Sequence, residues 1–107
     1  MTDATDLFFN VFRNKNRFRI LKLLSNKELC ASELQKELMI EQTNLSHDLK
    51  CLINCQFITV RKNGRKRIYK ISPETKELVE EVSKHIKKYE LYLKKCNIIK
   101  EEENEEI

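Results

Sequence analysis

Two of the four cysteines, Cys51 and Cys55, stand four residues apart in a segment with a helical pattern. Side chains at positions i and i+4 lie side by side on a helix, so both sulfurs could bind one ion. Cys96 could add a third sulfur, which in a dimer would come from the partner subunit. Thiolates prefer soft or thiophilic ions, so three sulfurs would suit Cd(II), Pb(II) or As(III) better than Mg(II) or Ca(II).

The residues alone leave two other interpretations of the cysteines open. Free cysteines often pack as small apolar side chains. Thiols can also sense oxidants, and an electropositive neighbour such as Lys50 would favour the thiolate of Cys51. The spacing therefore predicts a thiolate metal site, with packing and oxidation as its alternatives.

A second group of side chains with chemical potential is basic. From residue 57 to residue 72 the chain has six basic residues and no acidic one, and they flank Gly64, the only glycine. These residues are Arg61, Lys62, Arg65, Lys66, Arg67 and Lys70. Such a segment beside a polar helix suits the phosphate backbone of a nucleic acid.

The helix predicted over 42–54 has two different faces. A rotation of about 100° per residue places Leu45, Leu49, Leu52 and Ile53 on one side, which should pack inward. The polar side could enter the major groove of DNA, with the basic segment steadying the complex on the backbone. The residues expected to contact DNA are Gln42, Thr43, Asn44, Ser46, His47, Lys50, Arg65, Lys66 and Arg67.

Patterning predicts the elements that position these residues. Apolar stripes indicate helices over 5–14, 17–26 and 33–39, the third capped by Ser32. Strands over 57–61 and 66–71 surround an Asn63-Gly64 turn, which is a strong hairpin signal. Pro73 opens a long last helix at a favoured early position. The order predicts a mainly α chain with a small β-hairpin (α+β), arranged as a winged helix-turn-helix.

The last helix contains a repeated apolar seam with spacings of three and four residues, which is a heptad pattern. Its members are Val79, Val82, Ile86, Tyr89, Leu93 and Cys96. The seam predicts a homodimer that forms through the last helix with help from the first; of its members, we expect Val79, Val82, Ile86, Tyr89 and Leu93 in the interface.

Length and composition limit the alternatives. A chain of 107 residues is one domain, which we place at residues 1–100, and the five glutamates of residues 101–107 predict a disordered acidic tail. The chain shows neither a basic segment before an apolar core at its start nor an apolar run of the ~20 residues that a membrane span needs, so we expect a cytoplasmic protein.

In the reducing cytoplasm, the four cysteines are expected to be free thiols rather than disulfides. Without a glycine-rich phosphate loop, and with only two separated histidines, the chain is not expected to be an enzyme.

Four segments together resemble the ArsR/SmtB family of metal-responsive repressors. They are NRFRILKLL at 16–24, LCASELQKEL at 29–38, QTNLSHDLKCL at 42–52 and KNGRKRIYKI at 62–71, and the resemblance runs from about residue 8 to residue 96. It implies a winged-helix homodimer that binds a pseudo-palindromic operator in double-stranded DNA and releases it when metal binds.

The family has metal sites in several places, and each can be compared with this chain. A Cys-x-Cys site near the third helix is not implied, because Ser32 stands two residues after Cys30. The zinc site of the last helix is not implied either, because Pro73, Thr75, Ile86 and Tyr89 occupy the corresponding positions.

The cadmium- and lead-sensing branch does resemble the chain. It has a cysteine pair on the recognition helix, here Cys51 and Cys55, a late cysteine, here Cys96, and a counterpart of Cys30. Two alternatives stay open: a regulator that senses oxidants through its thiols, and a winged helix without an effector. A winged helix that binds protein instead of DNA is disfavoured by the uninterrupted basic segment.

Overall fold

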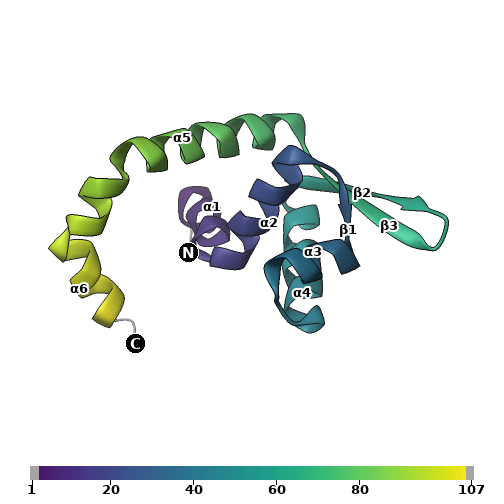
Figure 1. The fold of residues 1–107 in the computed structure, drawn as a ribbon, viewed down its shortest axis with the longest axis horizontal. Helices are drawn as coiled ribbons and strands as arrows, with labels where there is room; N and C mark the ends of the chain where they lie inside the picture. The colour runs from purple at the N-terminus through teal and green to yellow at the C-terminus, as the bar shows by residue number, and fades with distance from the viewer. Residues whose placement is uncertain (1–2, 106–107) are drawn as a thin grey trace.

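The computed structural model describes residues 3–105, which form a body of helices with a small sheet at one side (Figure 1). The elements in order are α1 (Ala4–Arg13), α2 (Lys15–Asn26), β1 (Leu29–Cys30), α3 (Ala31–Leu38), α4 (Gln42–Asn54), β2 (Ile58–Asn63), β3 (Lys66–Ile71), α5 (Pro73–Lys95) and α6 (Asn97–Glu105). The mainly helical fold class is therefore confirmed.

Caps explain where the helices begin. The Asn14 side chain accepts hydrogen bonds from the backbone N–H groups of Asn16 and Arg17, at 2.9 and 3.2 Å, so α2 starts two residues earlier than the apolar pattern predicted. The predicted cap of the third helix was wrong. Cys30 holds the N-cap position and donates its backbone N–H to Oε1 of Glu33 at 2.9 Å, while Ser32 lies inside the helix.

Helix α2 is the centre of the core and packs against α1, α3, α4, α5 and β3. The predicted inner face of α4 is confirmed, since Leu45, Leu49 and Leu52 are buried, with Ile53 half-buried at its margin. The largest fully buried side chains are Ile20, Leu21, Leu34, Leu45, Leu52, Ile58 and Val79. These side chains fix α4 against α2, so the outer face of α4 is held in a defined direction.

The sheet has three antiparallel strands in the order β1-β3-β2. β2 and β3 pair from Ile58 with Ile71 to Asn63 with Lys66, so the predicted hairpin is present. Its loop is one residue later than expected and consists of Gly64 and Arg65; Gly64 has a φ of 65°, which favours glycine at the first loop position. β1 was not predicted, because two residues are too few to show an alternating pattern.

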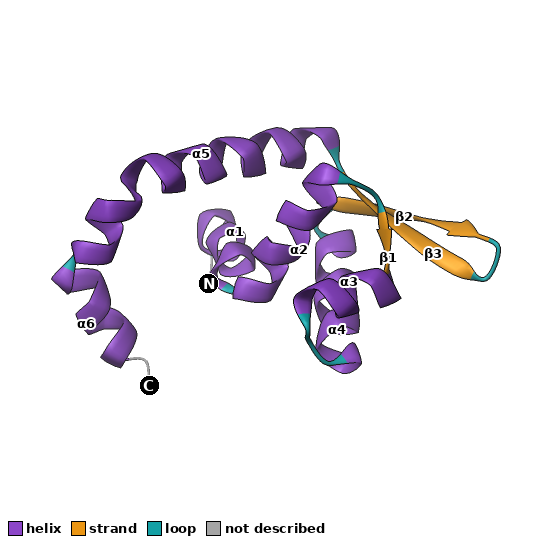
Figure 2. Ribbon diagram, in the orientation of Figure 1, coloured by secondary structure: helices purple, strands orange, loops and turns teal. Residues whose placement is uncertain are grey.

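Figure 2 shows the hairpin extending to the right from the helical body, while α5 runs along the top of the view, away from the hairpin, and α6 turns downward from its far end. The acidic segment expected to be disordered is helical through Glu105; residues 106 and 107 lie outside the described residues. Glutamate has a good helix propensity, which fits this continuation, and disorder of the segment in solution stays a prediction. Among the helices of residues 3–105, none is long and apolar enough to cross a membrane.

Candidate nucleic-acid interface and thiol pair

Helices α3 and α4 form a helix-turn-helix. The turn passes through Met39, whose left-handed backbone with a φ of 55° ends α3, and α4 begins after Glu41. The polar side of α4 is solvent-accessible along its length, as the sequence predicted. Its exposed residues include Gln42, Thr43, Asn44, Ser46, His47 and Lys50.

The hairpin forms a basic wing beside this helix. Arg65, Lys66 and Arg67 are exposed. Arg61 differs from them, because its guanidinium forms an ion pair with Glu28. At the start of α3, the pKa of Glu33 is held below its usual value by hydrogen bonds from Cys30, with a smaller contribution from the positive charge of Lys66. β3 of the wing pairs with β1, which directly precedes α3, so the wing lies close to the start of α3.

Cys51 and Cys55 lie at the C-terminal end of α4. Cys51 is half-buried, Cys55 is exposed at the C-cap, and both are free thiols. Partial burial of the thiol and the neighbouring Cys51, through its charge and its hydrogen bond, raise the pKa of Cys55, while the positive charge of Arg17 lowers it. The structure thus places the predicted pair one helical turn apart at the C-terminal end of α4.

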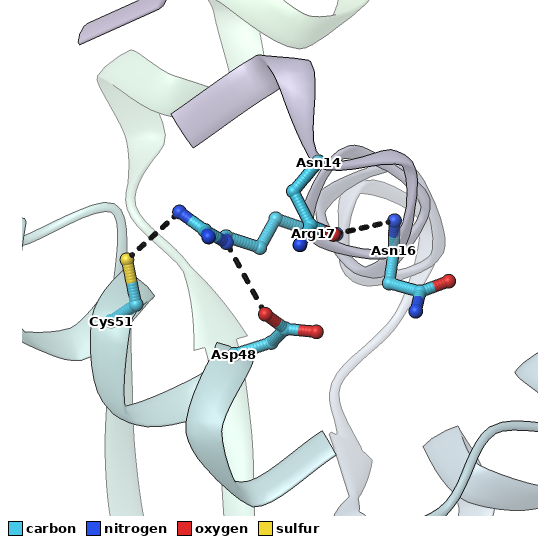
Figure 3. A network of polar contacts seen from close by, with 5 residues as sticks. All are labelled: Asn14, Asn16, Arg17, Asp48 and Cys51. Atoms are coloured by element: carbon cyan, nitrogen blue, oxygen red, sulfur yellow. Dashed lines mark hydrogen bonds and ion pairs between the residues drawn. The ribbon is translucent and has the colours of Figure 1, made fainter. Parts of the chain in front are cut away.

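The side chain that joins this pair to the rest of the fold was not predicted. Figure 3 shows Arg17 reaching from α2 to α4, where its Nε donates to Oδ1 of Asp48 at 3.2 Å and its Nη1 donates to Sγ of Cys51 at 3.3 Å. Lys50 was expected to be the electropositive neighbour of Cys51, but the cation in contact with the sulfur is Arg17. Asp48 could have indicated this contact, because it is a carboxylate on the buried side of α4, one turn before Cys51, and a buried carboxylate needs a partner.

Cys96 is not joined to the pair within one protomer. It is half-buried at the C-cap of α5, and the α5–α6 junction lies at the far end of the molecule from α4 in Figure 1. Over residues 3–105, no group of three or more His, Cys, Asp or Glu side chains could hold a metal ion. The two adjacent sulfurs fit a soft ion, and a third thiolate ligand would have to come from another subunit.

The predicted dimer seam requires one correction. Val79 is fully buried in the protomer's own core against α2, so it is not available to a partner. Farther along α5, Ile86, Tyr89 and Leu93 are 42%, 37% and 44% exposed. An apolar groove of about 210 Å³ lies beside this surface, between α1 and α5. Its lining residues are Phe8, Phe9, Phe12, Phe18, Leu78, Val82 and Ile86.

A helix-turn-helix followed by a two-stranded basic wing defines the chain as a winged helix-turn-helix protein. Residues 14–60 match the family model described as "Bacterial regulatory protein, arsR family". This part of the chain is similar to the helix-turn-helix of that family, as the resemblance implied. The match begins at the cap of α2 and ends in β2, so it includes Arg17, Asp48 and both cysteines of α4.

Known proteins agree with this assignment. The chain is 41% identical over 64 residues to the arsenical resistance operon repressor of Staphylococcus xylosus, covering 60% of this chain and 62% of that protein. For the protein of the same description from Staphylococcus aureus the identity is 37% over 62 residues, covering 58% and 60%. The chain thus spans about three fifths of the length of these relatives. The crystal structure of M. tuberculosis Rv0081 is 27% identical, with a TM-score of 0.74 over 81% of this chain and 93% of that one.

Proposed function

We propose that the chain is a homodimeric DNA-binding transcriptional repressor of the ArsR/SmtB type, released from its operator by a soft metal ion bound to thiolates, and that it is not an enzyme. The observation that carries the proposal is the position of Cys51 and Cys55 on α4, the helix whose exposed polar side faces away from the core. The names of the staphylococcal relatives, which describe repressors of arsenical resistance operons, support it.

DNA recognition is assigned to α4 and the wing. Exposed Gln42, Asn44 and Lys50 would meet base edges and phosphates in the major groove, and Arg65 and Arg67 would contact the backbone. Because α4 has no arginine, two-point recognition of guanine is disfavoured, whereas glutamine or asparagine can bind adenine through two hydrogen bonds. The function therefore calls for a pseudo-palindromic duplex that two copies of α4 can reach.

The dimer is assigned to the exposed apolar surface of α5 and the groove beside α1. Isolated apolar residues on a protein surface are ordinary, but a continuous set along one long helix beside an apolar groove is typical of an interface. Val82, Ile86, Tyr89 and Leu93 supply the α5 side. Two protomers related by a two-fold axis would present two recognition helices to the DNA.

The metal site is assigned to Cys51 and Cys55 of one subunit, with Cys96 of the other as the third ligand. Cd(II), Pb(II) and As(III) are the effectors that such a set of sulfurs would favour. When bound, the ion would supply a link between the recognition helix and the dimer helix. Coupling of this kind typically changes a second affinity by about 5- to 150-fold.

Serine substitutions test the assignment. Cys51→Ser and Cys55→Ser should each bind operator DNA nearly as the parent does but fail to release it with Cd(II) or Pb(II), because loss of a thiolate removes the preference for soft ions. Cys96→Ser should weaken the response, and Cys30→Ser, at a buried position, is the matched control. Anisotropy of labelled DNA reports release, and sulfur-to-metal charge-transfer absorption reports binding. If all four variants release DNA on addition of metal as the parent does, the thiolate site is not the sensor.

Oxidant sensing is the second candidate function. It is favoured by the guanidinium of Arg17 at 3.3 Å from Sγ of Cys51, since a neighbouring positive charge suits reactive thiols. Peroxide without metal should then release the DNA, and a thiol reductant should restore binding. Release by Cd(II) under reducing conditions, with no response to peroxide, would support the metal-sensing function instead.

A further inference from the structure

Arg17 is fixed at its base before its side chain reaches α4. It lies in the first turn of α2, where its backbone N–H donates to the Asn14 cap at 3.2 Å. Its side chain is 19% exposed and that of Asp48 only 5%, so the ion pair between them is largely shielded from water. A shielded pair of this kind is held more firmly than a surface ion pair.

The guanidinium makes two separate bonds to α4. Nε binds Asp48 and Nη1 binds Cys51, three residues and about one turn later, so a single side chain holds two successive turns of α4 against α2. Because the donors of a guanidinium are set at fixed angles, both bonds require one arrangement of the two helices. Arg17 thus couples the position of the sulfur to the position of α4.

The sulfur of Cys51 cannot serve both cations equally well. An ion bound to Sγ would compete with Nη1, which lies 3.3 Å from the sulfur, for space and for the sulfur's electron pairs, so Sγ would become a weaker acceptor for Nη1. The bond from Nε to Asp48 would remain after the bond from Nη1 to the sulfur is lost, because the carboxylate is a separate acceptor. Binding of the ion would therefore remove one of the two bonds and leave the other.

We propose that Arg17 is the positioning residue that transmits occupancy of the Cys51 sulfur to the recognition helix: a soft cation on Cys51 displaces Nη1, and α4 loses one of its two Arg17 anchors to α2. The proposal rests on the proposed function for its effect on DNA. By linkage, Arg17 and the ion oppose each other, so removing the Nη1 bond strengthens metal binding and removes its effect on α4.

Arg17→Lys is the test variant, because a lysine can keep the ion pair with Asp48 but has no second donor on a rigid fork. Arg19→Lys, at an exposed position two residues later on α2, is the matched control. In the absence of DNA, Arg17→Lys should bind Cd(II) several-fold more tightly than the parent by charge-transfer absorption. A purely structural role for Arg17 would leave that affinity equal or weaken it.

Amide hydrogen exchange of residues 42–54 supplies a second readout without DNA. Loading with Cd(II) should speed exchange in the parent and in Arg19→Lys, and should leave it unchanged in Arg17→Lys, whose bond to the sulfur is already lost. Cys51→Ser should keep the slow exchange of the metal-free parent, because the serine hydroxyl can accept the Nη1 bond in place of the sulfur, and should show no response to Cd(II). Thermal unfolding of each variant, followed by circular dichroism, identifies any loss of fold.

The two proposals fail in different ways. If the parent shows the exchange response but Cd(II) does not release DNA, the proposed function is wrong and the role of Arg17 stands. If the parent releases DNA and Arg17→Lys does so by the same factor, with the same Cd(II) affinity, the role of Arg17 is overturned. Equal exchange with and without Cd(II) in the parent would overturn it as well.

Discussion

Asp48 is the side chain whose removal should cost the fold most among the polar residues of α4. Asp48→Ala leaves the partly buried Arg17 without its carboxylate, so the free energy of unfolding should fall by about 3 kcal/mol. Urea denaturation measures this change. Glu28→Ala is the matched control, because it breaks the exposed ion pair with Arg61 and should cost less than about 1 kcal/mol. Equal losses would contradict the shielded pair.

Cys55 should react slowly with alkylating reagents at neutral pH. Its pKa is raised by burial and by Cys51, and the thiolate is the reactive form, so the reaction rate should reach its midpoint at a higher pH than for a free thiol. Mass spectrometry of the Cys55 peptide, after iodoacetamide treatment across a pH series, gives the profile. Cys51→Ser removes the charge of a neighbouring thiolate and should shift the midpoint to lower pH. A midpoint below that of a free thiol is the contrary result.

Helical periodicity predicted the exposed face of α4 but not the contacts that its side chains make. The polar face of α4 and the adjacent position of Cys51 and Cys55 follow from helical geometry alone. The bonds of Arg17 join residues 31 and 34 positions apart, and no local pattern specifies them. Leu7 is a smaller difference of another kind: it belongs to the apolar stripe of the first helix, yet it is 55% exposed in the protomer.

The wing is the element whose role has the clearest quantitative consequence. Arg65 and Arg67 are exposed, and each phosphate contact contributes roughly one unit to the slope of log affinity against log salt, so replacing both with alanine should flatten the slope by about two units. The loss should be alike for all DNA sequences. Replacing Lys87 and Lys100 on α5 and α6 removes the same charge elsewhere and should leave the slope unchanged. An unaltered slope for the wing variant would show that the wing does not touch DNA.

The main elements were predictable because each carries its own repeat or turn signal. α4 has the predicted bounds, and the hairpin follows from β-branched strands around Gly64. The errors have local physical causes: Asn14 extends α2 by capping it, and Cys30 displaces Ser32 as the cap of α3. β1 is a strand only because it pairs with β3. This is a tertiary contact, and a strand of two residues is too short to show a sequence pattern that would predict it.

For the molecule as a whole, Ile86→Glu tests the dimer. The side chain is 42% exposed in the protomer, so a charge there should be tolerated by the fold but become buried in a dimer interface. Sedimentation should show monomers, and DNA affinity should fall. Lys87→Glu, at the next and exposed position, should stay dimeric. A stable dimer of Ile86→Glu would place the interface elsewhere.

For the whole molecule, we propose that one soft ion bound at the α4 thiols weakens binding to DNA. The most direct measurement of this effect is the anisotropy of a labelled duplex from upstream of the protein's own gene, titrated under reducing conditions with and without one equivalent of Cd(II) per protomer. We predict a Kd raised by about 5- to 150-fold with the metal. Tight binding that is identical with and without Cd(II), while charge-transfer absorption shows the metal bound, would contradict the claim.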